Sequence, residues 1–542
     1  MRLFIYCSIV VLMLSSCGDK QVADLILQNG KVYTVDSTFS IQEAFAVKDG
    51  KIVATGSSSY ILRHYVSAKI VDAHGKAVYP GFIDAHAHFV GYGRGLFEVD
   101  LTGCNDWDEV LQRVIAFDKE HPGETWIRGR GWDQNRFPGH IYPNYAKLNG
   151  LFPGRPVLLQ RIDGHAAMAN IIALDLANIT PDLEVPGGEI ETKNGKLTGI
   201  LIDNAVDLVN RVMPPPSKAD YEKWLLAAQR KCFAQGLTTI TDCGLMYNDV
   251  EMIDTLQQEG KLLMRLYVML TDDTANFARY LAKGPYKTDL LFVKGIKAYA
   301  DGSLGSRGAC LLAPYNDKAG WNGFLLHPAA HYDSLAQMAL NSGFQLCTHA
   351  IGDSGNRVIL NVYNKYLQGK NDKRWRIEHA QVVNQNDFDL FGKTSIIPSV
   401  QPTHATSDMY WAADRIGSER LRYAYAYLQL LQQNGWIPLG TDFPVEDISP
   451  VKTFYAAVVR KDAKGYPSAG FQKENALTRE QALRGITIWA AKADFLEQEV
   501  GSIEAGKKAD FIILNADLMQ APENELLKTK VVATYSVGMK VY

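Results

Sequence analysis

A repeating order of strand and helix constrains what most of this chain can fold into. From about residue 237 onward, short apolar and β-branched runs end in polar residues and alternate with helix-like stretches. Such alternation is typical of βα units with a parallel sheet. The runs are "GLTTITDCG", "LLMRLYVML", "FVKGIKAYADGS", "FQLCTHAIGD", "RWRIEHAQ", "SIIPSVQPTH" and "WIPLGTDFPVED". Together with "GFIDAHAHF" near the N-terminus they make eight, which predicts an α/β fold of the closed (β/α)₈ TIM-barrel type.

Two histidines stand two residues apart in the first of these runs. Residues i and i+2 of a strand point to the same face, so we expect His86 and His88 side by side at the strand's C-terminal end. Paired neutral imidazoles suit Zn²⁺ and related metals. On these two residues alone, a chance pair is an equally good explanation, and the other strand ends must decide.

The ends of the other predicted strands supply further metal-ligand types. In a barrel, residues at the C-terminal ends of the strands converge on one mouth even when they lie far apart in the sequence. Imidazoles and carboxylates are the usual ligands of zinc and related divalent metals. The strand ends carry, in order, His86, His88, Lys297, His349, His379 and Asp442. Five of these six are ordinary metal ligands, so the sequence predicts a metal centre at the barrel mouth.

The same stretches resemble the amidohydrolase superfamily of metal-dependent hydrolases. Within it they are similar to the branch of YtcJ-like proteins and N-substituted formamide deformylase, amidohydrolase family 3. The matching stretches are "PGFIDAHAH", "IKAYADGSLGSR", "THAIGD", "IEHAQ" and "LGTDFPV", with the flanks "ADLILQNGKVYTVD", "AVKDGKIVATG" and "GSIEAGKKADFIIL". They span most of the chain and are together highly specific.

The resemblance implies a role for each predicted ligand. The histidine pair of the first strand would bind the more buried of two divalent metal ions, with zinc as the expected element. His349 and His379 would bind the second ion. Lys297 would carry a CO₂-derived carbamate that bridges both ions, and Asp442 would bind the first ion and handle the proton.

Lys297 also has a physical rationale of its own. A free ammonium beside two divalent cations is unfavourable, and with partial burial we expect the pKa of this lysine to fall. A neutral amine can add CO₂ to give a carbamate, whose two oxygens can bridge metals roughly 3.5–4 Å apart. For an isolated lysine, pairing with an acid at the strand end is an equally good explanation. Beside four histidines and Asp442 we favour the carbamate.

The expected activity is hydrolysis of an amide or formamide-type C–N bond, other than a peptide bond, in a small molecule. A water activated by the metals is the expected nucleophile, and Asp442 would pass its proton to the leaving amine. A superfamily deaminase, a lactonase or esterase, and a non-catalytic ligand-binding lipoprotein are the alternatives. Lys297 argues against the deaminases, which generally use one metal and lack this lysine, and the full ligand set argues against a non-catalytic role.

An insert interrupts the barrel after its first strand. A βα unit needs only about 30 residues, yet the first strand ends near residue 88 and the next run starts near 237. We place the insert at about 100–220, and the resemblance implies that it covers the barrel mouth. Candidate substrate contacts are Trp132, Asp133, Asp163 and His165 in the insert, and Ser303, Ser306 and Arg307 in the glycine-rich loop after Lys297. For each of them a purely structural role is an equally good explanation.

The two ends of the chain consist of short alternating segments with turns such as "NGK" and "DGK". Alternation marks half-buried antiparallel strands. We expect residues 22–79 and 495–542 to combine into one small β-sandwich beside the barrel, which would take up residues 80–494.

The first 17 residues, "MRLFIYCSIVVLMLSSC", indicate a secretory signal. The apolar run is too short to span a bilayer comfortably and ends in small residues before Cys17. "LSSC" resembles a bacterial lipobox, which implies export and a lipid on Cys17 that anchors the protein in the bacterial cell envelope. An ordinary signal with an incidental cysteine is the alternative.

The composition adds one restriction on partners. The formal net charge is −3 over 542 residues, which gives no basic footprint for nucleic acid. We therefore expect no nucleic acid as partner. The resemblance implies a small-molecule amide as substrate, and the lipobox implies contact with a membrane through the lipid on Cys17. The sequence leaves open whether the chain forms a homo-oligomer.

Overall fold

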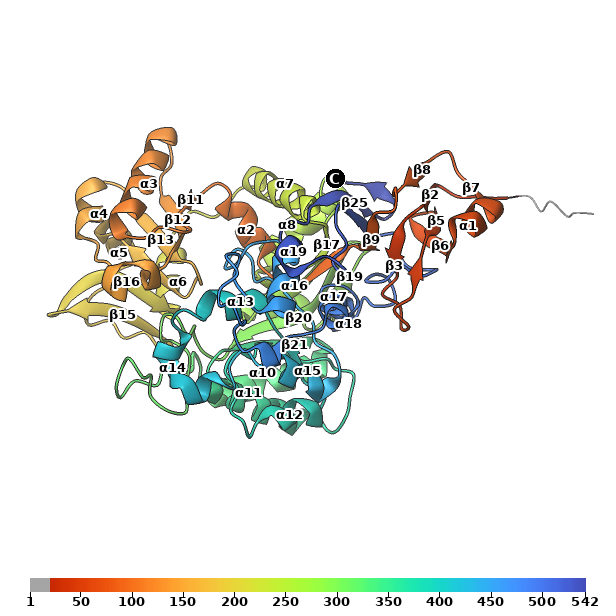
Figure 1. Ribbon diagram of the computed structural model, residues 1–542. Coiled ribbons are helices and arrows are strands. Elements are labelled where there is room, and N and C mark those ends of the chain that lie inside the picture. Colours follow the sequence, from red (N-terminus) through yellow and green to blue (C-terminus); the bar gives the residue numbers. More distant parts are fainter. Residues whose placement is uncertain (1–19) are drawn as a thin grey trace, which may run out of the picture.

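A nearly closed parallel barrel lies at the centre of the computed structural model, which describes residues 20–542 (Figure 1). Seven parallel strands follow one another around it: β10 (Phe82–Ala87), β17 (Leu237–Leu245), β18 (Arg265–Thr271), β20 (Leu291–Tyr299), β21 (Gln345–Ala350), β22 (Arg376–His379) and β23 (Ile397–Ser399). The secretory signal and the lipid-bearing Cys17 lie outside the described residues and stay predictions.

The eighth position of the barrel is occupied by residues 437–443, which do not form a regular strand. Val400 and Leu439 make an isolated parallel bridge on one side. On the other side, the Asp442 N–H donates to the His86 carbonyl at 2.7 Å. The prediction of a regular eighth strand is therefore wrong in detail. Pro438 has no N–H to donate to a neighbouring strand, and the backbone turns at Asp442, where φ is 63°.

The barrel strands are buried on both faces, because helices cover the outer face of a parallel barrel. In β17 and β18 nearly every residue is buried. Helices that include α7 (Lys218–Ala234), α10 (Ala329–Ser342) and α11 (Asp353–Tyr366) contribute apolar side chains to the same large core. This packing holds the strand ends, and the polar residues on them, in fixed positions.

A second sheet lies beside the barrel, built from the residues between β10 and β17 (Figure 1, orange to yellow). Its strand order is β11 (Val99–Asp100), β12 (Ile127–Trp132), β13 (Val157–Arg161), β14 (Ala166–Ala169), β16 (Lys196–Asp203) and β15 (Gly188–Lys193). Two separate apolar clusters pack against it. The extra residues after the first barrel strand thus have a core of their own.

Strands from both ends of the chain meet at the opposite side of the barrel (Figure 1). β9 (Ala77–Pro80) pairs antiparallel with β24 (Phe511–Leu514) in a six-stranded sheet. A four-stranded sheet contains β6 (Lys51–Gly56), β5 (Ala44–Lys48), β2 (Leu25–Gln28) and β8 (Ile70–Asp72). Phe45 from one sheet and Phe511 from the other share one apolar cluster. Because β9 runs through Gly81 directly into β10, this region anchors the first barrel strand.

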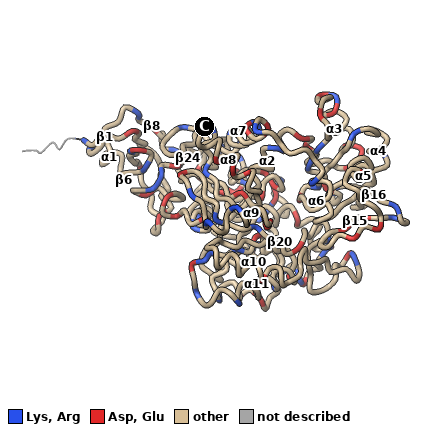
Figure 2. Tube along the Cα trace, turned by 180° about the vertical axis from the view of Figure 1, so that it is seen from behind, with Lys and Arg blue, Asp and Glu red and all other residues tan. Residues whose placement is uncertain are grey.

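Charged residues of both signs are interspersed along the chain in Figure 2. Within residues 20–542, no helix combines the length and the apolar character that crossing a membrane requires.

Candidate metal centre

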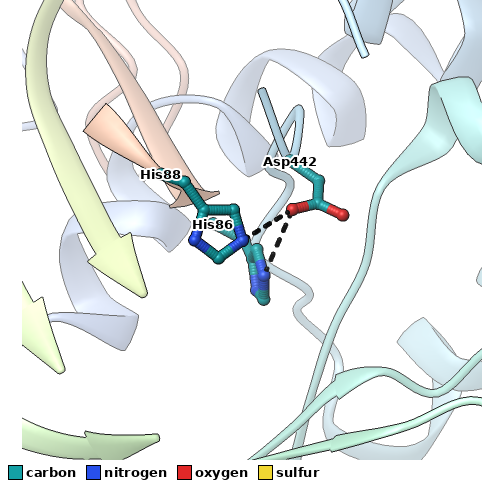
Figure 3. Close-up of side chains that lie close together, drawn as sticks. All are labelled: His86, His88 and Asp442. Carbon is teal, nitrogen blue, oxygen red and sulfur yellow. Dashed lines mark ion pairs between the residues drawn. The ribbon is translucent and has the colours of Figure 1, made fainter. Parts of the chain in front are cut away.

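His86 and His88 at the end of β10 point toward Asp442 (Figure 3). The Nε2 atoms of His88 and His86 lie 3.2 and 3.6 Å from Asp442 Oδ1. Zinc–nitrogen bonds of about 2.0–2.1 Å in tetrahedral geometry separate neighbouring ligand atoms by roughly 3.3 Å. The three side chains therefore have the spacing expected of ligands that share one ion.

Glu378 fixes the orientation of His86. Its Oε2 lies 2.5 Å from His86 Nδ1, and both side chains are fully buried. A carboxylate behind Nδ1 selects the tautomer and turns Nε2 toward Asp442. The sequence gives little sign of this contact, because Glu378 stands directly before the predicted ligand His379 and meets a histidine 292 residues away.

Lys297 in β20 points at the same space. Its Nζ lies 3.2 Å from His86 Nε2, and the residue is 1% exposed. Burial lowers the pKa of Lys297, but nearby Tyr299, Cys243 and Glu378 outweigh it and hold this pKa above its ordinary value. The protein's own groups thus oppose the predicted fall in pKa, which would have to come from the charge of the metal ions. Carboxylation of Lys297 stays a prediction.

His349 and His379 lie at the C-terminal ends of the neighbouring strands β21 and β22, with their rings close together. Their ring centroids are 4.6 Å apart, and the His379 ring is 4.7 Å from that of His86. The Nδ1 of His379 is hydrogen-bonded to Gln401 Oε1 at 2.7 Å. Burial, reinforced by neighbouring positive charge, holds the pKa of both histidines well below the ordinary value. Both are therefore neutral at pH 7, the form that binds a metal.

His404 approaches Asp442 from another side. It lies in α13 (Pro402–Asp408), and its Nε2 is 3.3 Å from Asp442 Oδ2 without the alignment of a hydrogen bond. Burial lowers the pKa of His404, but Asp442 outweighs it and raises this pKa to about 9. The signal for His404 was present in the sequence, since the run "SIIPSVQPTH" ends in it.

The ionisation of Asp442 is set by these imidazoles. Burial raises the pKa of Asp442, but contacts with His404 and His88 outweigh it and hold this pKa well below its ordinary range. The side chain is therefore a carboxylate at neutral pH. Its Oδ1 faces the β10 pair and its Oδ2 faces His404.

The residues present fit divalent metal ions. His349 Nε2, Asp442 Oδ1 and Glu378 Oε1 are buried without a hydrogen-bond partner among residues 20–542. Such atoms are costly unless an ion or a water completes their contacts. Candidate ligand atoms within 4.8 Å of one another form the groups His86–His88–Asp442 and His379–His404–Asp442. Imidazole and carboxylate are ligands that zinc takes in proteins, and Asp442 belongs to both groups.

His165 brings the insert into contact with the metal centre. Its ring centroid lies 5.0 Å from that of His349 and 6.3 Å from that of Tyr299. Its Nδ1 is hydrogen-bonded to Asp203 Oδ1 at 2.6 Å. The structure thus places this candidate substrate contact against a predicted metal ligand.

Arg161 of the insert forms ion pairs with both Asp133 and Asp163. The buried guanidinium of Arg161 lies 2.5 Å from a carboxylate oxygen of each. Asp163 also accepts from Ser303, whose hydroxyl lies 2.7 Å from that of Ser306. This network joins the insert to the loop after β20, so its members have structural contacts whatever else they do.

Trp132 and Arg307 lie in contacts that favour the structural alternative. Trp132 is fully buried in the insert's own apolar cluster, and its indole N–H donates to the Leu159 carbonyl at 2.7 Å. Its ring packs within the insert and has no exposed surface, which favours a structural role. Arg307 pairs with Asp317 at 2.9 Å.

Known proteins match this chain over nearly its whole length. The profile of the amidohydrolase family matches residues 69–542. The putative amidohydrolase YtcJ of Bacillus subtilis is 31% identical over 528 residues, which cover 95% of this chain and 99% of that protein. Protein LONG AFTER FAR-RED 3 of Arabidopsis thaliana is 33% identical over 96% of this chain and 92% of its own length. The N-substituted formamide deformylase of Arthrobacter pascens is 27% identical over 96% and 99%.

Solved structures show the same architecture. An uncharacterized metal-dependent hydrolase from Pyrococcus horikoshii superimposes with a TM-score of 0.76 at 28% identity, over 92% of this chain and 99% of its own. One from Pyrococcus furiosus gives 0.73 at 27% identity, over 92% and 100%. The similarity therefore extends well beyond the barrel strands.

Proposed function

The chain belongs to the amidohydrolase family of metal-dependent hydrolases, and we propose that it hydrolyses the C–N bond of a small non-peptide amide, such as a formamide. Similarity to an N-substituted formamide deformylase over nearly the full length of both chains supports this bond type. The residues around Asp442 supply the chemistry that such a reaction needs.

The position of Asp442 supports the proposal most. One oxygen of this buried carboxylate faces His86 and His88, and the other faces His404. A carboxylate placed in this way can hold an ion with Oδ1 and exchange a proton at Oδ2. Proton exchange by a positioned carboxylate is a usual means of hydrolytic catalysis.

The first ion would be held by His86, His88 and Asp442, and the second by His349 and His379. Lys297, as a carbamate, would lie between them. When bound, such ions lower the pKa of a water molecule and polarise a carbonyl oxygen. Zinc matches this donor set.

The chain's own residues orient the reacting groups and move the proton. Glu378 and Gln401 fix the rings of His86 and His379. Asp442 is a carboxylate at neutral pH, so it can accept the proton of the attacking water at Oδ2, the oxygen that faces His404. The same oxygen then delivers that proton to the leaving nitrogen as the C–N bond breaks.

The test is turnover of a panel of formamides, other amides, lactones, esters and cyclic amidines. Chelated protein should be inactive and regain amide hydrolysis when zinc and bicarbonate are added. Asp442→Asn should bind metal under the same conditions but turn over about 10²–10⁴-fold more slowly than the wild type. Turnover confined to lactones and esters, or confined to cyclic amidines, would contradict the proposed amide hydrolysis. Activity that survives complete removal of metal would contradict the proposed metal centre.

A further inference from the structure

Three arginines gather between the first barrel helix and the insert, and one carboxylate pairs with two of them. Arg94 lies in α2 (Phe89–Gly95), and Arg128 and Arg130 point to the same face of β12 because they are two residues apart. Glu98 Oε1 lies 3.0 Å from Arg128 Nε and 3.4 Å from Arg94 Nε. Arg130 makes no ion pair within residues 20–542, so this cluster has an excess of positive charge.

The guanidinium of Arg130 is poorly satisfied by the protein. In the described part of the chain its one hydrogen bond runs from Nη2 to the Ile162 carbonyl at 3.0 Å. Its Nε is buried without a partner. A buried donor atom of a charged group is unfavourable unless a counter-charge or an acceptor completes its contacts. Burial lowers the pKa of Arg130, yet a guanidinium stays charged at neutral pH.

Neighbouring segments place this guanidinium at the barrel mouth. It lies against Gly164, where an added Cβ would come within 3.2 Å of Arg130 Nη2. The next residue is His165, whose ring contacts that of His349. The helix α2, which carries Arg94, begins directly after His88. Among neighbouring carboxylates, Asp442 does most to oppose the lowering of the pKa of Arg130 by burial.

We propose that Arg130 binds a carboxylate of the substrate, so that the enzyme acts on amides that carry an anionic group near the scissile bond. The inference deepens the proposed hydrolysis and depends on it. A guanidinium presents a planar fork of donors that matches a carboxylate. The Nη1 of Arg130 donates to no protein group within residues 20–542 and, unlike Nε, is not a buried atom, so it is available for such a contact beside Nη2.

The test uses two amides of equal length, one ending in a carboxylate and the other in a primary carboxamide, with the metal-loaded full chain. Wild-type kcat/KM should be higher for the carboxylate. Arg130→Gln should lower this preference roughly 10- to 100-fold, the loss expected for one charge-assisted hydrogen-bonded contact. Arg130→Lys should retain part of it, because the charge remains without the fork.

Arg128→Gln is the matched control. It removes the same charge from the same face of the same strand, but its guanidinium is already occupied by Glu98. A general loss of positive charge, without direct contact, should change the preference less than about 3-fold. Metal content and melting temperature are measured for each variant, so that a loss of folding is recognised.

The outcomes separate this inference from the proposed function. Equal loss on both substrates in Arg130→Gln would overturn the inference and assign Arg130 to the reaction step. A wild-type protein that hydrolyses both amides equally well would overturn it and leave the hydrolysis intact. If neither amide is hydrolysed, the proposed function fails for these amides. The inference is then tested by ligand binding instead of turnover.

Hexanoate should raise the melting temperature of the wild-type holoprotein more than hexanamide does, and this difference should vanish in Arg130→Gln. A difference of equal size in both proteins would overturn the inference.

Discussion

Glu378 Oε2 lies 2.5 Å from His86 Nδ1, and neither side chain has any exposed surface. Burial raises the pKa of Glu378, but His86 and Arg376 outweigh it and hold this pKa below its ordinary value. Glu378 is therefore an anion behind a predicted metal ligand. Such a carboxylate fixes the ring of the histidine and makes its other nitrogen a better ligand.

Glu378→Gln should weaken metal binding while keeping the shape of the side chain. The expected loss of metal affinity is about 10- to 100-fold, the usual effect of a group behind a ligand histidine. Competition with a chromophoric chelator measures it. Glu480→Gln, at the half-exposed end of an ion pair with Arg484, is the control and should bind metal as the wild type does. Unchanged affinity in Glu378→Gln would show that this carboxylate does not position His86 for an ion.

Lys297 and Asp442 should fail in different ways when they are replaced. Lys297→Ala removes the bridge, so it should lose metal together with activity, and a short carboxylic acid in solution should partly restore both. Asp442→Asn keeps an oxygen near the ion but loses the proton acceptor. It should retain much of its metal while kcat falls about 10²–10⁴-fold. Near wild-type turnover in Asp442→Asn would rule out Asp442 as the residue that moves the proton.

Elemental analysis of protein purified without chelator should give about two divalent metals per chain. Asp272, His327 and His331 form a further group of candidate ligands, half-buried and separate from Asp442. His331→Ala removes that group and serves as the control. The variant should keep both metals of the centre and its activity. A value near zero, even after reconstitution with metal and bicarbonate, would contradict the two-metal centre.

Reconstitution of the metal-free protein should depend on pH through Lys297. Because the pKa of Lys297 is held above its ordinary value, the side chain is an ammonium at neutral pH, and only the neutral amine adds CO₂. The neutral fraction rises about 10-fold per pH unit below the pKa. At a fixed concentration of dissolved CO₂, the initial rate of reactivation should therefore rise about 10-fold from pH 7 to pH 8. A flat profile would mean that the amine is already neutral when CO₂ arrives.

Attachment to the membrane should depend on Cys17. We propose that residues 1–16 are removed and that Cys17 carries the lipid. Cys17→Ala should then move the protein from the membrane fraction to the soluble fraction without a change in metal-dependent activity. Cys7→Ala is the control, because it lies in the segment that is removed, and it should leave the attachment intact. A Cys17→Ala protein that stays membrane-bound would point to another anchor.

The strand ends were the most informative part of the sequence. Polar residues that close apolar runs converge in a parallel barrel, and the structure does bring His86, Lys297, His379 and Asp442 into one space. The prediction was possible because apolar runs in the sequence mark the buried strands, and parallel strands of a barrel all end at the same mouth. The irregular backbone of residues 437–443 was predictable only in part, because Pro438 argues against a regular strand but the turn at Asp442 is visible only in the structure.

Contacts between distant side chains were the part that the sequence could not supply. Glu378 and Gln401 orient two histidines, but nothing in their local sequence says which ring each one meets. Trp132 shows the converse: the "GWDQ" stretch made it a candidate substrate contact, but the structure buries its side chain in the apolar cluster of the insert. The unpaired state of Arg130 is likewise visible only after all neighbouring carboxylates have been placed.

The seam between residues 437–443 and β10 gives the barrel an order of assembly during synthesis. Asp442 donates its backbone N–H to the His86 carbonyl, and Thr441 donates its hydroxyl to Asp84 at 2.7 Å, across a separation of 357 residues. A nascent chain that ends before residue 442 therefore has the histidines of the first strand but no carboxylate to complete their site. An ion that binds the finished site adds about 2.7 kcal/mol to the stability of the closed barrel when its free concentration is 100 times Kd. The free metal concentration that a newly made chain meets would thus influence how stable the junction of its first and last barrel segments is.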